Sequence, residues 1–212
     1  MATLSLKAQN VAPLSMLTVF FLIVAHWVTK GSINTEQLPT LIPTASALAV
    51  AGVISVWLTY LIPADLKHML VFFRTKNVLP GHRFIRLSEK DARIDNEQLN
   101  TEIKDIAEMR GSPAQQNQYW YRTIYRPLGD EPEVASIHKS FLLYRDAASV
   151  ALICLMFFGI GQVAIPELSA IIGLKGLGII ATFMAFLLLA ANTAGNRFVT
   201  TSVAVFLSGR AD

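Results

Sequence analysis

Four long apolar runs constrain this chain more than any other feature, and they cover residues 11–28, 39–62, 147–165 and 168–191. A helix that crosses a bilayer needs roughly 17–25 apolar residues, and helix is the default because lipid offers no partner for backbone polar groups. Charged residues make up only 16% of the chain, against about 25% in soluble domains. Helices of a soluble bundle are the alternative that this composition disfavours. We predict an all-α membrane protein with four transmembrane helices, arranged two plus two.

The distribution of Lys and Arg predicts the orientation of these helices. Thirteen of these residues lie between the second and third runs, in segment 63–146. Positive residues close to membrane spans favour the cytoplasmic side. We therefore expect a bacterial inner-membrane protein whose termini are both cytoplasmic. Its predicted parts are transmembrane helices 1 and 2 (11–62), a cytoplasmic insert (63–146), transmembrane helices 3 and 4 (147–191), and a cytoplasmic C-terminal tail (192–212).

We predict that the insert consists of a few short helices. Its helix starts and stops are marked by capping and breaking residues, namely Pro80-Gly81, Asp95 or Asn96, Gly111, Ser112-Pro113 and Pro132. These signals predict that the second span continues as a helix to about residue 79, that one helix covers about 95–110, and that the last runs into the third span. The segment HRFIRL (82–87) alternates charged and apolar residues, which favours a short strand or extended chain. The insert has little core of its own, so we expect a homo-oligomer.

The most distinctive segment of the insert is QNQYWYRTIYRP (116–127). At 100° per residue on a helix it separates into two faces. The apolar face holds Trp120, Tyr121, Ile124 and Tyr125, for which core packing or subunit contact is the simplest role. The other face holds Tyr119, Arg122 and Arg126.

Two arginines beside an aromatic ring can clamp a phosphate and stack a base, so Tyr119, Arg122 and Arg126 are candidate ligand-binding residues. Salt bridges to the preceding acidic helix are the alternative role, with Glu102, Asp105 and Glu108 as partners, and lipid contact is a third. Arg83 and Arg86 join the candidates because residues 65–93 carry seven basic and three acidic groups. That basic half also suits contact with anionic lipid headgroups.

Three polar residues near the inner ends of the spans are candidate pore-lining residues. Asn192 and Asn196 lie one helical turn apart at the end of the fourth run, and Asp146 opens the third. Repeated in several subunits, the two asparagines would form a polar constriction. Hydrogen bonding between helices is their alternative role. For Asp146 the alternatives are neutralisation by Arg145 or exposure to water.

No sequence pattern in the chain indicates an enzyme. It contains no phosphate loop, no spacing typical of metal ligands and no plausible catalytic triad, and its single cysteine, Cys154, lies within an apolar run. We therefore expect neither catalysis nor a cofactor nor a bound metal.

A short chain with four spans and a compact cytoplasmic part resembles the small membrane subunits of bacterial anti-phage defence systems, such as those of Hailong and Kiwa. The resemblance covers the whole chain as a layout and transfers no functional residue. It implies a membrane effector that assembles with itself, as a tetramer in some relatives, and opens a channel in response to a nucleotide or oligonucleotide. The leading hypothesis is thus a ligand- or partner-gated channel or effector. A non-conducting scaffold that recruits a cytoplasmic partner protein to membrane lipid is the alternative, and a small transporter is a weaker third.

Overall fold

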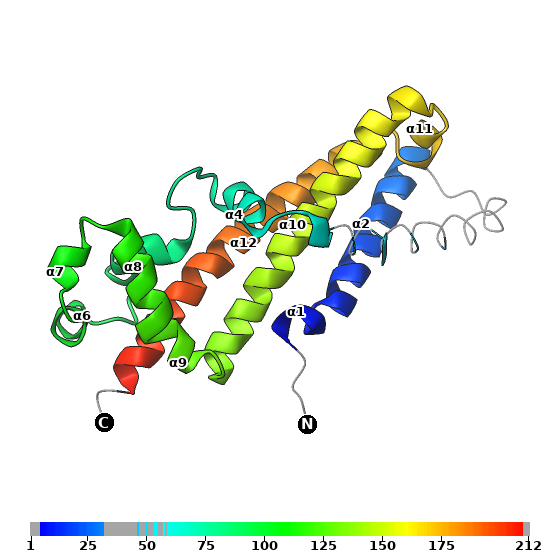
Figure 1. Cartoon of the computed structure of the whole chain (residues 1–212). Coiled ribbons are helices and arrows are strands. Elements are labelled where there is room, and N and C mark those ends of the chain that lie inside the picture. Colours follow the sequence, from blue (N-terminus) through cyan, green and yellow to red (C-terminus); the bar gives the residue numbers. More distant parts are fainter. Residues whose placement is uncertain are drawn as a thin grey trace. The chain divides into compact units, whose positions relative to one another are not determined.

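The protein is helical throughout the part for which its structure is described. The computed structural model describes residues 5–31 and 59–209, together with residues 46, 50, 53, 54 and 57. No strand occurs among these residues (Figure 1). The chain divides into two compact units, which we call the apolar unit (Met1–Lys67 and Leu143–Leu189) and the insert unit (His68–Leu142 and Ala190–Asp212).

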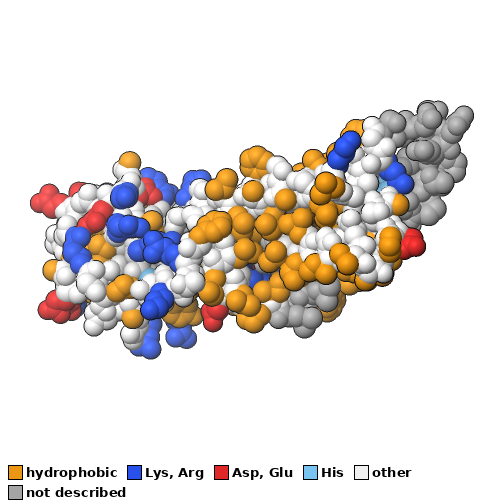
Figure 2. Space-filling model, turned by 90° about the horizontal axis from the view of Figure 1, so that it is seen from above, with side chains coloured by type: hydrophobic (Ala, Val, Ile, Leu, Met, Phe, Trp, Pro, Cys, Tyr) orange, Lys and Arg blue, Asp and Glu red, His pale blue; other side chains and the backbone are white. Residues whose placement is uncertain are grey.

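Three of the described helical segments are long and apolar enough to cross a membrane. They are Leu6–Lys30, made of α1 (Leu6–Gln9) and α2 (Val11–Lys30), then α10 (Pro132–Ala164), and finally α12 (Leu174–Ser208). Hydrophobic side chains gather on the visible surface of the apolar unit, as lipid-facing helices require (Figure 2). The fourth predicted span, 39–62, lies largely outside the described residues. The structure thus supports three spans of the predicted four.

Within the apolar unit, α2 packs against the beginning of α12 and the short α11 (Leu168–Ile171). The Nδ1 atom of His26 lies 2.6 Å from the carbonyl oxygen of Ile171. A Cβ atom at Gly176 would lie 2.6 Å from the carbonyl oxygen of Ala25, so only glycine permits this approach. Helix α2 ends where Gly31 adopts a φ of 81° and donates its N–H to Trp27.

Short helical elements occupy the rest of the described chain. They are η2 (Thr59–Leu61), α4 (Ala64–Phe72), η3 (Pro80–Arg83), α5 (Phe84–Ser88), α6 (Asn96–Glu102), α7 (Ile106–Met109), α8 (Pro113–Tyr119), the π-helical η4 (Trp120–Tyr125) and α9 (Arg126–Leu128). Two predicted starts are confirmed, because Ser112 precedes α8 with Pro113 at its first position, and α10 begins at Pro132 and continues unbroken to Ala164.

Three sequence predictions about the insert are wrong, for identifiable reasons. HRFIRL is helical in η3 and α5, because the adjacent Phe84 and Ile85 are both buried, whereas a strand would turn them to opposite faces. The helix predicted over 95–110 is interrupted between α6 and α7, where Asp105 adopts a left-handed φ of 56° that no regular helix allows. The predicted extension of the second span is divided between η2 and α4 and ends at Phe72.

The insert unit has a hydrophobic core that the sequence did not predict at this size. Its members are Phe84, Ile85, Ile94, Leu99, Ile103, Ile106, Met109, Trp120, Ile124, Val134, Phe198, Val199, Val203 and Leu207. The last four belong to α12. Residues predicted as a C-terminal tail are therefore, up to Ser208, part of helix α12, which contributes to the core of the insert unit.

Trp120 connects this helix to the remainder of the core. Its indole Nε1 donates a buried hydrogen bond of 2.9 Å to the Ser202 hydroxyl. Its ring meets Phe198 edge to face at 5.3 Å and stacks on Tyr125 at 5.4 Å. Such aromatic contacts contribute about 0.5–1.5 kcal/mol each beyond the area they bury.

We predict that Phe198→Ala unfolds or loosens the insert unit, because a truncated buried phenylalanine costs about 3–5 kcal/mol. Phe186→Ala is the matched control, since Phe186 lies on the same helix but is 66% exposed where Phe198 is 6% exposed. Hydrogen exchange of backbone amides in residues 96–128 is the measurement. Equal protection in the two variants would show that α12 does not support the insert core.

Candidate functional site

The segment 116–127 forms the end of α8, the π-helical η4 and the start of α9. The π geometry is visible in the bond from the Arg126 N–H to the Tyr121 carbonyl, five residues back. Such wide turns are rare and frequently occur at functional sites. They also change the angle per residue, so the two faces predicted for a regular helix are only partly correct.

Trp120 and Ile124 are buried in the core, as predicted, but two tyrosines differ from the prediction. Tyr121, assigned to the apolar face, is 49% exposed. Tyr119, assigned to the recognition face, is partly buried and its ring stacks on Phe84 at 6.2 Å. Tyr125 packs at the edge of the core and lies within 3.1 Å of His138 Nδ1 through its hydroxyl. The extra residue in the π turn accounts for this rotation.

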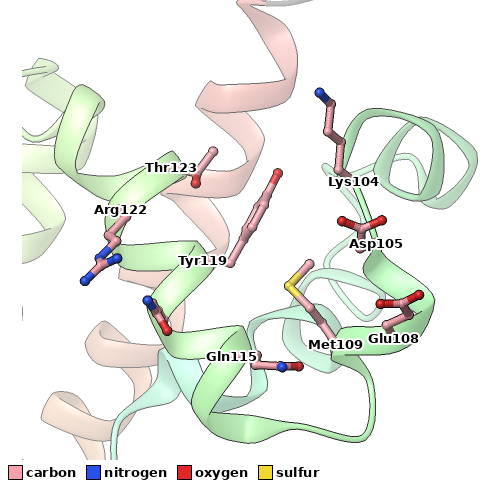
Figure 3. A pocket seen from close by; sticks show the side chains of 9 residues that line it. Lys104, Asp105, Glu108, Met109, Gln115, Tyr119, Arg122 and Thr123 are labelled. Atoms are coloured by element: carbon pink, nitrogen blue, oxygen red, sulfur yellow. The ribbon is translucent and has the colours of Figure 1, made fainter.

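Tyr119 and Arg122 line a pocket of about 360 Å³, which we call the Tyr119 pocket. Its other lining residues are Lys104, Asp105, Glu108, Met109, Gln115, Gln118 and Thr123. Figure 3 shows the Tyr119 ring between Arg122 on one side and Lys104, Asp105 and Glu108 on the other. Two cations face two carboxylates, so the charges in this pocket balance.

The salt bridges considered for Arg122 and Arg126 are not formed in the described part of the chain. Neither arginine pairs with Glu102, Asp105 or Glu108 there. Both guanidinium side chains are on exposed residues, and Arg126 does not line the Tyr119 pocket. The structure thus separates the predicted group of Tyr119, Arg122 and Arg126 into two residues at a pocket and one outside it.

Arg83 and Arg86, the other two predicted ligand-binding residues, line a second pocket of about 360 Å³, which we call the Arg83 pocket. Its other lining residues are His82, Ile85, Glu89, Arg110, Pro113 and Gln116. Three arginines face one carboxylate, and Glu89 is already ion-paired with Arg110. This pocket is therefore strongly positive, unlike the Tyr119 pocket.

Arg83 is the most constrained of these arginines. It is partly buried, its guanidinium lies 5.3 Å from the centre of the Phe72 ring, and one nitrogen donates to Asn196 Oδ1 at 3.3 Å. Burial, with smaller effects from Arg74 and Arg86, lowers the pKa of Arg83 to about 10. Arg83 remains charged at neutral pH, and it also donates to the carbonyl oxygens of Val78 and Leu79 at 3.4 and 3.5 Å.

Gln116 lines the Arg83 pocket, but its amide oxygen is buried and is not exposed to that pocket. It is 6% exposed, and its amide nitrogen donates to the carbonyl oxygens of Met109 and Arg110 at 3.0 and 3.3 Å. These two bonds determine which amide atom is nitrogen. The amide oxygen then has no hydrogen-bond partner among the described residues. Leaving such a group unsatisfied typically costs about 1–3 kcal/mol.

The predicted pore-lining asparagines are engaged within the insert unit. Asn192 donates to the Val71 carbonyl at 3.1 Å, and Asn196 donates to the Asn192 side chain at 2.9 Å. Asn196 in turn accepts from Arg83. This continuous chain of hydrogen bonds, which we call the asparagine relay, corresponds to the alternative role of helix-to-helix bonding. It links the Arg83 pocket to α12 and to α4.

Asp146, the third predicted pore residue, is in a buried charge cluster of the apolar unit. Its Oδ1 atom accepts from Lys67 at 3.0 Å and from Arg145 at 3.0 and 3.1 Å. All three side chains are at least nine-tenths buried. Burial lowers the pKa of Lys67, and the Asp146 charge opposes that change. Neutralisation by Arg145 was an expected alternative, whereas the contribution of Lys67 was not expected.

Two residues of the Arg83 pocket were missed by sequence reasoning, namely Arg110 and Gln116. Arg110 follows α7 and Gln116 lies on α8, while Arg83 and Arg86 belong to η3 and α5. No spacing in the sequence relates these segments. The sequence predicts only that Gly81 ends a helix. In the structure, a Cβ at this position would collide with Asn117 and lie 2.7 Å from the Trp120 ring. That glycine allows η3 to approach α8 and so forms one side of the pocket.

We predict that Asp146→Asn destabilises the apolar unit by about 3–5 kcal/mol, because it leaves two buried cations without their carboxylate. Asp65→Asn is the control, because Asp65 on α4 is exposed, and it should cost less than about 1 kcal/mol. Denaturant unfolding in detergent is the measurement. Adding Lys67→Met to Asp146→Asn should recover stability, and a further loss would contradict the role assigned to Lys67.

Comparison of the chain with known proteins finds no relative. No protein-family model matches it, and no curated protein and no solved structure shows significant similarity to it. The layout resemblance to anti-phage membrane subunits therefore stays a prediction, and the residues and their geometry carry the functional interpretation.

Proposed function

We propose that this protein is a membrane effector, gated by a charged ligand that binds the insert unit. The observation that carries the proposal is the asparagine relay. Arg83 lines a pocket and is simultaneously bonded to Asn196 on α12. A ligand that engages Arg83 competes with that bond. Binding at the pocket thereby changes the contacts of a helix that also contains a candidate membrane span.

The membrane location is supported by the apolar helices, and the orientation by the Lys and Arg residues near the ends of segment 63–146. Lys and Arg side chains are prominent on the visible surface of the insert unit (Figure 2). We propose that this unit and both termini are cytoplasmic, in a bacterial inner membrane. Membership of an anti-phage system is part of the proposal and is supported by the layout alone.

We propose further that the effector acts as a homo-oligomer, with a tetramer favoured, and that it forms an ion channel. So few spans in one chain enclose a water-filled path most simply between copies. The path is not assigned to Asn192 and Asn196, because their side chains bond within the insert unit. These asparagines serve instead as the connection between ligand site and helix.

A second candidate function is a non-conducting scaffold that recruits a cytoplasmic protein, and one observation favours it. Arg122 and Arg126 are exposed and form no ion pair in the described part of the chain, and the neighbouring Tyr121 is exposed too. Arginine and tyrosine are enriched at protein interfaces. If the protein is a scaffold, Tyr121, Arg122 and Arg126 form its docking surface.

Ion flux in liposomes tests the channel function. We predict that the full chain conducts and that adding ribose 5-phosphate or AMP changes the flux roughly 5- to 150-fold, the usual range of allosteric coupling. Asn196→Leu, which cuts the asparagine relay, should remove that response, whereas Thr193→Leu on the exposed side of the same helix should retain it.

Absence of flux in the wild type and in Asn196→Leu, with each probe and without, would reject the channel. The scaffold then makes its own prediction. A soluble protein should co-purify with the wild type and be lost from Arg122→Glu/Arg126→Glu, with the oligomer size unchanged. Retention of that protein by the double variant would reject the docking surface.

A further inference from the structure

We infer that the Arg83 pocket binds a small phosphorylated molecule. The inference deepens the proposed function by naming the ligand class of its gating site, and for its role in gating it rests on that function. Binding itself, however, can be measured whether or not the protein conducts. Three features of the pocket lead to this ligand class.

The first feature is unbalanced charge. Arg83, Arg86 and Arg110 surround the pocket, and Glu89 offers the only carboxylate among its lining residues. That carboxylate pairs with Arg110. Arg86 forms neither an ion pair nor a side-chain hydrogen bond within the described residues. An anion placed here gains the guanidinium donors of Arg86 and relieves the crowding of positive charge around Arg83.

The second feature is the chemistry of the cations. Guanidinium groups present planar pairs of N–H donors, which match the oxygens of a phosphate and make short, charge-assisted bonds. Several arginines converging on one site can contact different oxygens of one phosphate group. A simple halide ion makes no use of this directionality, and a carboxylate has fewer oxygens to share among the donors.

The third feature is size. The pocket volume of about 360 Å³ falls at the lower end of the range for small-molecule sites, about 300–1,000 Å³. Ile85 and Pro113 give it an apolar wall beside the polar groups. A sugar phosphate or one nucleotide suits this volume. The Tyr119 pocket has a similar volume but balanced charges, so it offers no comparable attraction for phosphate.

The same chemistry can come from two sources, a soluble metabolite or a lipid headgroup such as that of phosphatidylglycerol, which joins a phosphate to hydroxyl groups. The experiment uses the full chain in phosphatidylcholine nanodiscs and isothermal titration calorimetry. Ribose 5-phosphate, methyl phosphate and inorganic phosphate are titrated separately. Ribose 5-phosphate should bind about tenfold more tightly than methyl phosphate, because only its sugar is large enough to cover the apolar wall of Ile85 and Pro113. Nanodiscs that contain phosphatidylglycerol form the second arm. If that lipid weakens ribose 5-phosphate binding, the lipid headgroup occupies the same site, and unchanged binding identifies the soluble molecule as the source.

Substitutions localise the binding to this pocket. Arg86→Gln should weaken ribose 5-phosphate about tenfold or more, since it removes a charge-assisted contact. Lys104→Gln removes one positive charge from the Tyr119 pocket of the same unit and should leave affinity within about twofold. The comparison of ribose 5-phosphate with methyl phosphate probes the apolar wall without a mutation that disturbs the fold.

Absence of binding by every phosphate, or equal weakening by Arg86→Gln and Lys104→Gln, overturns the inference. Equal affinity for ribose 5-phosphate and methyl phosphate overturns the role of the apolar wall. Binding without ligand-dependent flux leaves the site intact and rejects the gating function, whereas flux that responds to a phosphate unaffected by Arg86→Gln rejects this site alone. The two proposals can thus fail independently.

Discussion

The insert unit depends on the C-terminal part of α12 lying in its core. A hydrophobic cluster is completed by Phe198, Val199, Val203 and Leu207, and its other members come from four short helices, the segments that flank α6 and the start of α10. Short helices of four to seven residues are not stable alone in water, because their stability comes from tertiary packing. The hydrogen bond from Trp120 to Ser202 also fixes how the indole ring is oriented against α12. Without this helix the short elements would have no common surface to cover.

The functional interpretation follows from the same helix. Because α12 is anchored in the insert core, Asn196 comes within reach of Arg83, and Asn192 within reach of Val71. The side chains of Asn192 and Asn196, which were predicted to line a pore, therefore form hydrogen bonds within the insert unit. The positive pocket and the relay share Arg83, which makes that arginine the point where ligand chemistry and helix contacts meet. The Tyr119 pocket, by contrast, is not lined by a residue of the asparagine relay.

Particular residues show why some of this was predictable. Ser112-Pro113 and Pro132 start α8 and α10 as expected, because capping and the fixed φ of proline act locally. Leu99, Ile103, Ile106 and Met109 are all buried as their spacing predicts, yet Asp105 interrupts the helix between them. Tyr121 is exposed and Tyr119 stacks on Phe84 because a π turn replaces the regular spacing. Arg83 and Arg86 were candidates from charge alone, but Arg110 and Gln116 were not.

The sequence by itself determined that the protein is helical, where three apolar spans lie and that residues 65–93 carry an excess of basic groups. These properties depend on composition, hydrophobic length and local capping, all of which act over a few residues. Tertiary structure alone decided that the presumed tail is a core helix, that Asp146 pairs with Lys67, and that Arg83, Arg110 and Gln116 form one pocket. Each of those contacts joins residues far apart in the chain. Periodic patterns in the sequence predict local structure but not which distant segments pack together.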